Sequence, residues 1–196
     1  MKQFLLLAAI STCVSATPVP YDVVVYGGTS GGVIAAVQAA KSGRSVVLVS
    51  PSPHVGGLTT SGLGWTDLKN AAILGGLSKE FYHRVYLYYA AQPNWNTVKS
   101  MAGQNVAGFD QTNELGYIFE PKVASQIYDE MLAGTQVEIF TGLIDLTHGV
   151  AMSGQRITSI KLEDGRVFTG KMFIDASYEG DVMAQAGVSL DRKSVV

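Results

Sequence analysis

The residues best suited to chemistry are glycines in a short turn near the start of the chain. The segment YGGTSGG, residues 26–32, follows an apolar run and precedes an alanine-rich one. A dinucleotide-binding turn needs glycine at its first position, where the chain turns tightly, and at its last, where helix and strand pack closely. Gly27 and Gly32 fill these positions, and Thr29 holds the middle one, where glycine is usual. The pattern favours a phosphate-binding turn over a merely tight strand–helix turn.

Two further features follow the next apolar run, residues 45–49. In dinucleotide-binding folds a carboxylate often binds the ribose at the end of this second strand. Ser50 holds that place here, and its hydroxyl would bind a ribose less strongly than a charged acceptor would. Gly56 and Gly57 come next, and paired glycines let the chain pass close to a large ligand. These residues weaken an NAD interpretation and favour a flavin nucleotide.

Other kinds of chemistry have little support in the sequence. The formal net charge is −2 over 196 residues, without a run of lysine or arginine, so no nucleic-acid partner is predicted. His83 and His148 stand apart from any set of metal ligands, so no metal site is predicted. We find no Ser-His-Asp set, paired-carboxylate signature or P-loop lysine. A bound cofactor would therefore carry the chemistry, acting on a small-molecule substrate.

The elements that position these residues indicate an α/β fold with a parallel sheet. Continuous β-branched runs are typical of strands buried on both faces, and the alanine-rich segment between the first two predicts a helix. This βαβ unit is the smallest piece of a Rossmann-like nucleotide-binding fold. Short strands later in the chain predict a β-meander. We expect strands over 21–26, 45–49, 137–140, 143–147, 156–162, 167–169 and 171–175, and helices over 32–41, 78–91, 121–133 and 181–186.

Local signals predict the boundaries of several elements. Ser78 is expected to cap the helix that begins there. Pro121 suits the first turn of the following helix. Asp164 and Gly165 predict a type I′ hairpin turn between two strands of the meander. The loop over 50–74 is long enough that we expect it to serve a function.

Three separate motifs, in order, resemble FAD-dependent oxidoreductases of the two-dinucleotide-binding, glutathione-reductase-like type. They are GGTSGGVIAAVQAAKSGRSVVLVSPSPHVGGLTTSGLGWTD, FEPKVASQIYDEML and FIDASYEGDVMAQAGV. The chain is most similar to a group of secreted fungal and bacterial members, in which threonine is common in the glycine motif. The resemblance runs from about residue 21 to 188. It implies FAD as the cofactor and hydride transfer from an organic substrate to the flavin.

The resemblance also assigns cofactor-binding roles. The glycine turn would hold the FAD diphosphate, Ser50 would lie near the adenosine ribose, and the paired glycines would lie beside the diphosphate and ribityl chain. A backbone group near Leu143 would meet the adenine, and Ala176 and Asp181 would border the cofactor. The expected cofactor-binding residues are Gly27, Gly28, Thr29, Ser30, Gly31, Gly32, Ser50, Gly56, Gly57, Leu143, Ala176 and Asp181.

Several residues have competing interpretations. Asp181 would serve equally well as the cap of the helix that follows it. Trp65 could reach the flavin or the substrate, but a buried tryptophan that anchors its loop is favoured. The tyrosines within 82–89 are more typical of a core than of a sugar-binding face. His54 is interpreted as an ordinary loop histidine rather than a covalent flavin attachment point. The pair over 177–178 departs from the family's usual Thr-Gly, which leaves the local geometry open.

The first sixteen residues are typical of a secretory signal peptide. Lys2 provides the positive start, residues 4–10 form a short apolar run, and small residues precede a cleavage site after Ala16. The apolar run is far shorter than the roughly 20 residues that span a bilayer. Cys13, the one cysteine, would be removed with this segment. A lipoprotein role for Cys13 is disfavoured, because threonine is a poor residue to precede a lipid-modified cysteine. We therefore expect an extracellular protein.

Residues 17–196 are expected to form a single FAD/NAD(P)-binding Rossmann-like domain. Enzymes of the resembled type need a further substrate domain, and this sequence ends just after the third motif. We expect the domain to be truncated before the substrate domain and to be inactive by itself. The alternative is a non-catalytic secreted nucleotide-binding fragment or interaction module.

We predict that the exported protein begins at Thr17, because the small residues up to Ala16 match what signal peptidase requires. N-terminal sequencing of protein collected from the medium tests this. Extracellular protein that keeps Met1 would contradict the prediction.

Overall fold

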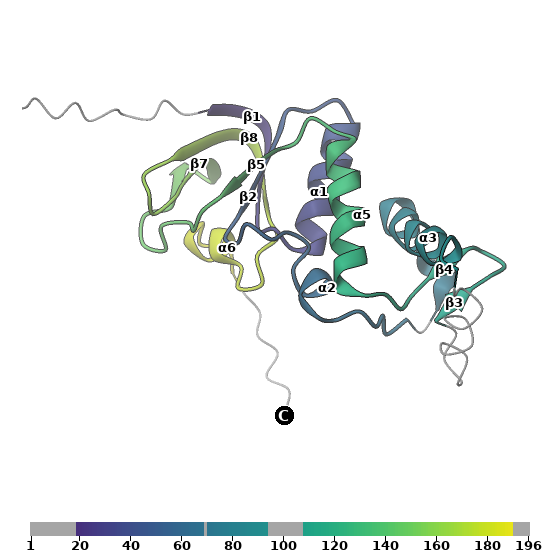
Figure 1. The fold of residues 1–196 in the computed structure, drawn as a ribbon. Helices are drawn as coiled ribbons and strands as arrows, with labels where there is room; N and C mark the ends of the chain where they lie inside the picture. The colour runs from purple at the N-terminus through teal and green to yellow at the C-terminus, as the bar shows by residue number, and fades with distance from the viewer. Residues whose placement is uncertain (1–18, 69, 94–107, 190–196) are drawn as a thin grey trace, which may run out of the picture.

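A six-stranded sheet forms the centre of the structure (Figure 1). The computed structural model describes residues 19–68, 70–93 and 108–189. β1 lies between β2 and β8, and β5 pairs with the other side of β2. These four strands run parallel: β1 (Val19–Tyr26), β2 (Val46–Ser50), β5 (Glu138–Thr141) and β8 (Val167–Asp175). The predicted α/β, Rossmann-like fold class is confirmed.

Three long helices lie on one side of the parallel strands: α1 (Ser30–Lys41), α3 (Gly76–Ala90) and α5 (Pro121–Ala133), with α3 packed on the other two helices. Figure 1 shows α1 beside α5, with α3 farther from the sheet. Their apolar side chains, among them Val33, Phe81 and Ile127, form one core with Val25 and Leu48 of the sheet. Burial of this apolar surface is the main force that holds the helices to the sheet.

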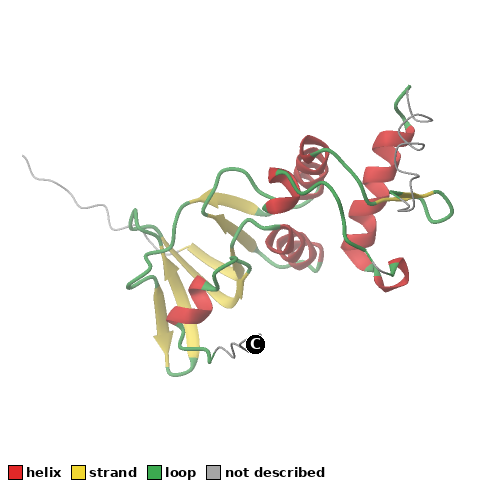
Figure 2. Ribbon diagram, turned by 90° about the horizontal axis from the view of Figure 1, so that it is seen from below, coloured by secondary structure: helices red, strands yellow, loops and turns green. Residues whose placement is uncertain are grey.

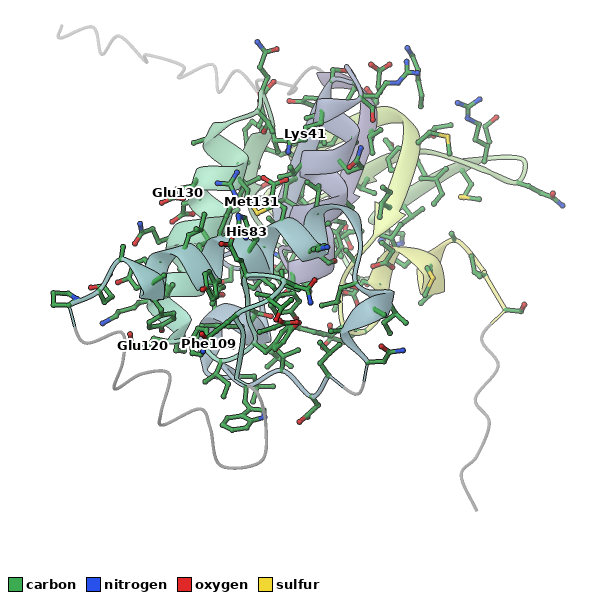
Figure 3. All side chains as sticks on the ribbon, turned by 90° about the vertical axis from the view of Figure 1, so that its right-hand side faces the viewer. Lys41, His83, Phe109, Glu120, Glu130 and Met131 are labelled. Carbon is green, nitrogen blue, oxygen red and sulfur yellow. The ribbon has the colours of Figure 1, made fainter. Side chains whose placement is uncertain are left out.

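Ion pairs join the same helices at their surface. The Nζ atom of Lys41 lies 3.2 Å from Glu80, which links α1 to α3. Arg84 of α3 lies 3.7 Å from Glu130 of α5. Figure 3 labels Lys41 and Glu130, the α1 and α5 members of these pairs. Partly exposed pairs of this kind contribute about 0–1 kcal/mol each. The apolar core therefore stabilises the helix layer, and the charges add little.

An antiparallel meander continues the same sheet beyond β8, and side chains from this part of the chain pack on the other face of the parallel strands. β6 (Val150–Ser153) pairs with β7 (Arg156–Lys161), which pairs with β8. Ile144, Ile160 and Leu162 have no exposed surface and pack with Val24 and Val47 of the central strands. Figure 2 shows the strands gathered on one side of the molecule and the long helices on the other. The central strands are thus buried on both faces, as their continuous apolar runs predicted.

Short elements complete the fold. The loop after β2 contains α2 (Leu58–Ser61) and a 3-10 turn, η1 (Ala71–Ile73). A small two-stranded ribbon, β3 (Phe109–Asp110) and β4 (Leu115–Gly116), lies against α3, and α6 (Asp181–Gln185) follows β8. The long loop is therefore partly structured.

Three strand predictions need correction. The strand expected over 143–147 is wrong, because Asp145 Oδ1 accepts the N–H groups of Thr147 and His148 at 3.0 and 2.9 Å and holds the segment in a turn. The sequence does not predict β6, most of whose residues are exposed. The strands expected over 167–169 and 171–175 are one strand, because Gly170 keeps close contact with Val24 of β1.

The type I′ turn predicted at Asp164–Gly165 is also wrong. Such a turn needs positive φ at both residues, and only Gly165 has it, at +89°. Gly165 donates its N–H to Leu162 O at 3.0 Å, and Leu162 donates its own to Arg166 O at 2.8 Å. The hairpin is therefore closed by a three-residue loop with glycine in the left-handed position.

Helix boundaries agree better with the sequence. The helix predicted over 121–133 has those bounds, because Pro121 pre-sets the first-turn geometry. α1 begins at Ser30, earlier than expected, because Thr29 serves as its cap. The Ser78 cap is wrong, since α3 already begins at Gly76.

Asp22 of β1 contacts both Lys171 of β8 and Ser45 just before β2, and these contacts provide a pH-dependent test of the fold. Asp22 Oδ1 accepts a hydrogen bond from Lys171 Nζ at 2.6 Å, and Oδ2 accepts one from Ser45 N at 3.1 Å. The hydrogen bond from Lys171 is the main reason that the pKa of the Asp22 carboxyl falls to about 2. Because the folded pKa lies below the unfolded value of about 3.9, this stabilisation is present at neutral pH and is lost as pH falls towards 2.

We expect Asp22→Asn to lower the free energy of unfolding at pH 7. The difference from wild type should hold down to about pH 5 and shrink towards pH 2. Urea denaturation across this pH range measures it, with Asp129→Asn on the exposed face of α5 as the control. A difference that stays constant with pH would contradict this role.

Candidate functional site

The predicted site residues gather at one edge of the sheet, beyond the carboxyl ends of the parallel strands. Gly27 follows β1, Ser50 ends β2, Leu143 comes shortly after β5, and Ala176 follows β8. Ligands in α/β folds bind at this edge. The hydrogen bond from Gly142 N to Ser50 O, 2.9 Å, brings the end of β5 beside β2. Residues far apart in the sequence therefore line a common surface.

Two glycines of the turn, Gly27 and Gly32, are packed so closely that a side chain there would overlap neighbouring atoms. A Cβ on Gly32 would overlap the carbonyl oxygen of Gly27. A Cβ on Gly27, whose φ is +109°, would overlap the backbone of Ala176. Gly31 differs, since it is exposed and its Cβ would find Thr29 Oγ1 at 3.7 Å as the nearest atom. The N-terminus of the 12-residue helix α1, which is the positive end of its dipole, therefore lies at the carboxyl edge of the sheet.

Thr29 holds this turn together. Its Oγ1 accepts the N–H of Gly32 at 3.2 Å and donates to Ala176 O at 2.9 Å. The hydroxyl therefore caps α1 and ties it to the end of β8. Its single proton is already donated to Ala176 O, so the hydroxyl has none left to give to a phosphate oxygen.

Ser50 is likewise engaged. Its side chain lies beneath Gly28, where a Cβ would overlap Ser50 Oγ. The residue is only 2% exposed, and Oγ donates to Ser52 O at 2.6 Å. Ser50 does lie at the expected place at the end of β2. The direct hydrogen bond to a ribose stays a prediction, and it would have to compete with Ser52.

The second glycine segment lies directly beside the first. Gly56 N donates to Gly28 O at 2.7 Å, and Ser30 Oγ donates to Gly56 O at 2.8 Å. Ser30 Oγ also lies 2.6 Å from Thr59 Oγ1. Gly56 and Gly57 have φ values of +102° and +56°, which favour glycine. The two glycine segments therefore lie side by side, while their expected position at the FAD diphosphate stays a prediction.

The turn after β8 forms the far wall of the site. Ser177 Oγ donates to Asp175 Oδ1 at 2.7 Å and accepts the N–H groups of Gly180 and Asp181 at 2.9 and 3.1 Å. α6 begins at Asp181 with Gly180 as its cap, so the capping role proposed for Asp181 is wrong. Burial, followed by Glu179 and Asp175, raises the pKa of the Asp181 carboxyl. That Asp181 borders the cofactor stays a prediction.

Two cavities lie along this edge. The turn cavity, about 280 Å³, is lined by residues that include Gly27, Gly28, Ser50, His54, Gly57 and Tyr178. The outer cavity, about 420 Å³, is lined by residues that include Gly31, Ile34, Thr59, Trp65, Asp67 and Tyr82. One lies on each side of the first turn of α1. Together they have a size typical of ligand and cofactor sites, which hold about 300–1,000 Å³.

The structure revises several interpretations of single residues. Trp65 is 53% exposed and lines the outer cavity, so the buried-anchor interpretation is wrong. Tyr89 is buried, and its hydroxyl accepts the N–H of Glu120 at 2.8 Å. Tyr82 packs edge-on against Phe81, which favours the core interpretation of these tyrosines. His54 Nε2 lies 3.2 Å from Thr60 O, so this nitrogen already has a partner.

Tyr178 and Leu58 belong to the site although sequence reasoning assigned them no role. Tyr178 extends from the turn after β8, and its hydroxyl accepts the N–H of Leu58 at 2.8 Å. The departure from the family's Thr-Gly at 177–178 is the one signal in the sequence that points to this region. The contact of the Tyr178 side chain with Leu58 could not be read from the sequence, because it depends on the fold.

Two negative findings concern the described residues alone. In this part of the chain, His, Cys, Asp and Glu form no group suited to a metal ion. Among the helices described, none has the length and apolar character needed to cross a bilayer.

The parallel sheet, the glycine turn and the cavities define an α/β protein that binds a dinucleotide. The chain belongs to the FAD dependent oxidoreductase family, whose model matches residues 22–192. FAD is therefore the cofactor, and the residues present fit it, because the glycine cradle would be filled by any Cβ at Gly27, Gly28 or Gly32. A comparison with curated protein sequences gives no match.

Solved structures share the fold. L-proline dehydrogenase from P.horikoshii superposes with a TM-score of 0.59 at 14% identity, over 89% of this chain and 58% of that one. L-amino acid deaminase from Proteus myxofaciens gives 0.56 at 16% identity, over 89% of this chain and 50% of that one. The chain thus spans about half the length of these flavoproteins. At such identities the likeness concerns the fold.

We predict that Gly32→Ala lowers the free energy of unfolding by about 1–3 kcal/mol, because the new methyl group overlaps Gly27 O. FAD binding should be lost with the geometry of the turn. Gly31→Ala is the matched control, since alanine fits there and favours a helix by about 1 kcal/mol. Urea denaturation compares the three proteins, and equal stability of the two variants would refute the packing argument.

Proposed function

We propose that this protein is the FAD-binding portion of a secreted oxidoreductase that transfers hydride from a small organic molecule to the flavin. The observation that carries the proposal is the meeting of two glycine segments, over 27–32 and 56–57, at the carboxyl edge of the sheet between two cavities. FAD has two halves joined by a diphosphate, and this arrangement offers a place for each.

In this proposal the diphosphate lies over the glycine turn. Backbone N–H groups and the positive end of the α1 dipole would stabilise its charge. The adenosine half would occupy the turn cavity, near the buried Ser50 and the backbone of Leu143. The Leu143 carbonyl accepts the N–H of Glu163 at 2.9 Å, and the Leu143 N–H is the group proposed to meet the adenine. Asp181 would border the ribityl chain.

The outer cavity would then receive the flavin ring. The bound flavin accepts hydride when it is present, and the protein binds and orients it. Ile34, Phe81 and Phe119 supply apolar lining that excludes water, and Asp67 is the charged side chain among the lining residues described. Trp65 offers an exposed aromatic face at the cavity's rim.

The substrate class follows less directly. The two structural relatives bear names that indicate amino-acid substrates. The described lining of the outer cavity contains no lysine or arginine, the groups that bind a substrate carboxylate best. Uncharged alcohols and sugars therefore belong in a substrate panel beside amino acids.

Export remains part of the proposal on the strength of residues 1–16, which lie outside the described part of the chain.

We predict that the purified chain binds one FAD and prefers it to NAD⁺ and NADP⁺. The reason is the absence of a ribose carboxylate at Ser50 together with the paired glycines. The protein is incubated with each nucleotide and separated by gel filtration, and retained flavin absorbs near about 450 nm. Retention of a nicotinamide nucleotide in preference to FAD would contradict the proposal.

A further inference from the structure

The two cavities at the proposed cofactor site meet at a single residue. Leu58 lines both of them, while Tyr178 lines the turn cavity alone. The hydrogen bond from Leu58 N to Tyr178 Oη, 2.8 Å, stands at this boundary. A ligand that occupies only the turn cavity can bind without reaching the outer cavity. On the FAD path proposed above, a ligand that extends into both cavities runs past this contact.

Tyr178 lies close over the second glycine segment. A Cβ on Gly57 would overlap the Tyr178 hydroxyl and would lie 3.1 Å from Thr29 Cα. The hydroxyl is therefore held in the narrow space between the two glycine segments, where the middle of a dinucleotide would pass. It also uses the Leu58 N–H, a backbone donor that would otherwise face a ligand oxygen.

The side chain is free to leave this position. Tyr178 is 62% exposed, so little packing opposes rotation of its ring. The neighbouring Ser177 is anchored to Asp175 and to two backbone N–H groups of the turn. The backbone at this position is thus fixed, while the Tyr178 ring is held mainly by one hydrogen bond and can rotate away when that bond breaks.

We propose that Tyr178 is a specificity-determining residue that closes the passage between the turn cavity and the outer cavity. FAD, which extends into both, binds by displacing the Tyr178 hydroxyl from the Leu58 N–H. A ligand confined to the turn cavity, such as adenosine, which lacks the diphosphate, binds with this hydrogen bond in place. The inference rests on the proposed binding path of FAD.

The test compares Tyr178→Phe with wild type in the full chain. The variant keeps the ring and removes the hydroxyl that competes for Leu58 N–H. We expect FAD to bind about 5-fold more tightly, as loss of one competing hydrogen bond allows, and to associate faster. Adenosine affinity should stay within about 2-fold, since adenosine has no diphosphate that could compete for the Leu58 N–H. Flavin fluorescence and stopped-flow mixing measure FAD binding, and calorimetry measures adenosine binding.

Tyr88→Phe is the matched control, because it removes a tyrosine hydroxyl on α3 that lines neither cavity. Circular dichroism melting verifies that both variants are folded, as the exposure of Tyr178 leads us to expect. Unchanged or weaker FAD binding by Tyr178→Phe overturns the inference alone, as does an equal gain for adenosine. Failure of both wild type and Tyr178→Phe to bind FAD overturns the proposed function and this inference together.

Discussion

The close approach of helix α1 to the end of β1 is the constraint on which the rest of the site depends. It exists because Gly32 presents only hydrogen to the carbonyl oxygen of Gly27. The same turn presses against Ala176, so the end of β8 is fixed by the contact that fixes α1. A side chain at either glycine would push α1 away from the strand ends and change the shape of the site. The direction of α1, and with it the positive end of its dipole, follows from this one packing contact.

Hydroxyl groups around the site hydrogen-bond to other parts of the protein and hold these elements in place. Thr29 ties α1 to β8, Ser30 ties the two glycine segments together, and Ser177 organises the turn before α6. Because these side chains already have partners, the recognition of a diphosphate depends on backbone N–H groups and the helix dipole. Such a site is pre-organised, since the groups that shape it need not rearrange when the ligand arrives.

Much of this architecture could be predicted, and the failures have physical causes. The buried strands and the helix over 121–133 follow from continuous apolar runs and a first-turn proline, which are local properties. The strand expected over 143–147 fails because the Asp145 carboxylate captures two backbone N–H groups, which apolar content does not reveal. Trp65 is exposed, against expectation, because its surroundings are set by segments distant in sequence. The contact of Tyr178 with Leu58 joins residues 120 positions apart and has no local signal.

The central claim is that one FAD lies across both cavities with its diphosphate over the glycine turn. A crystal structure of the protein grown with FAD tests it most directly. The account predicts diphosphate density against residues 27–32, adenine density beside Leu143 and flavin-ring density in the cavity lined by Thr59 and Trp65. Flavin-ring density next to Ser50, or diphosphate density away from the first turn of α1, would contradict it.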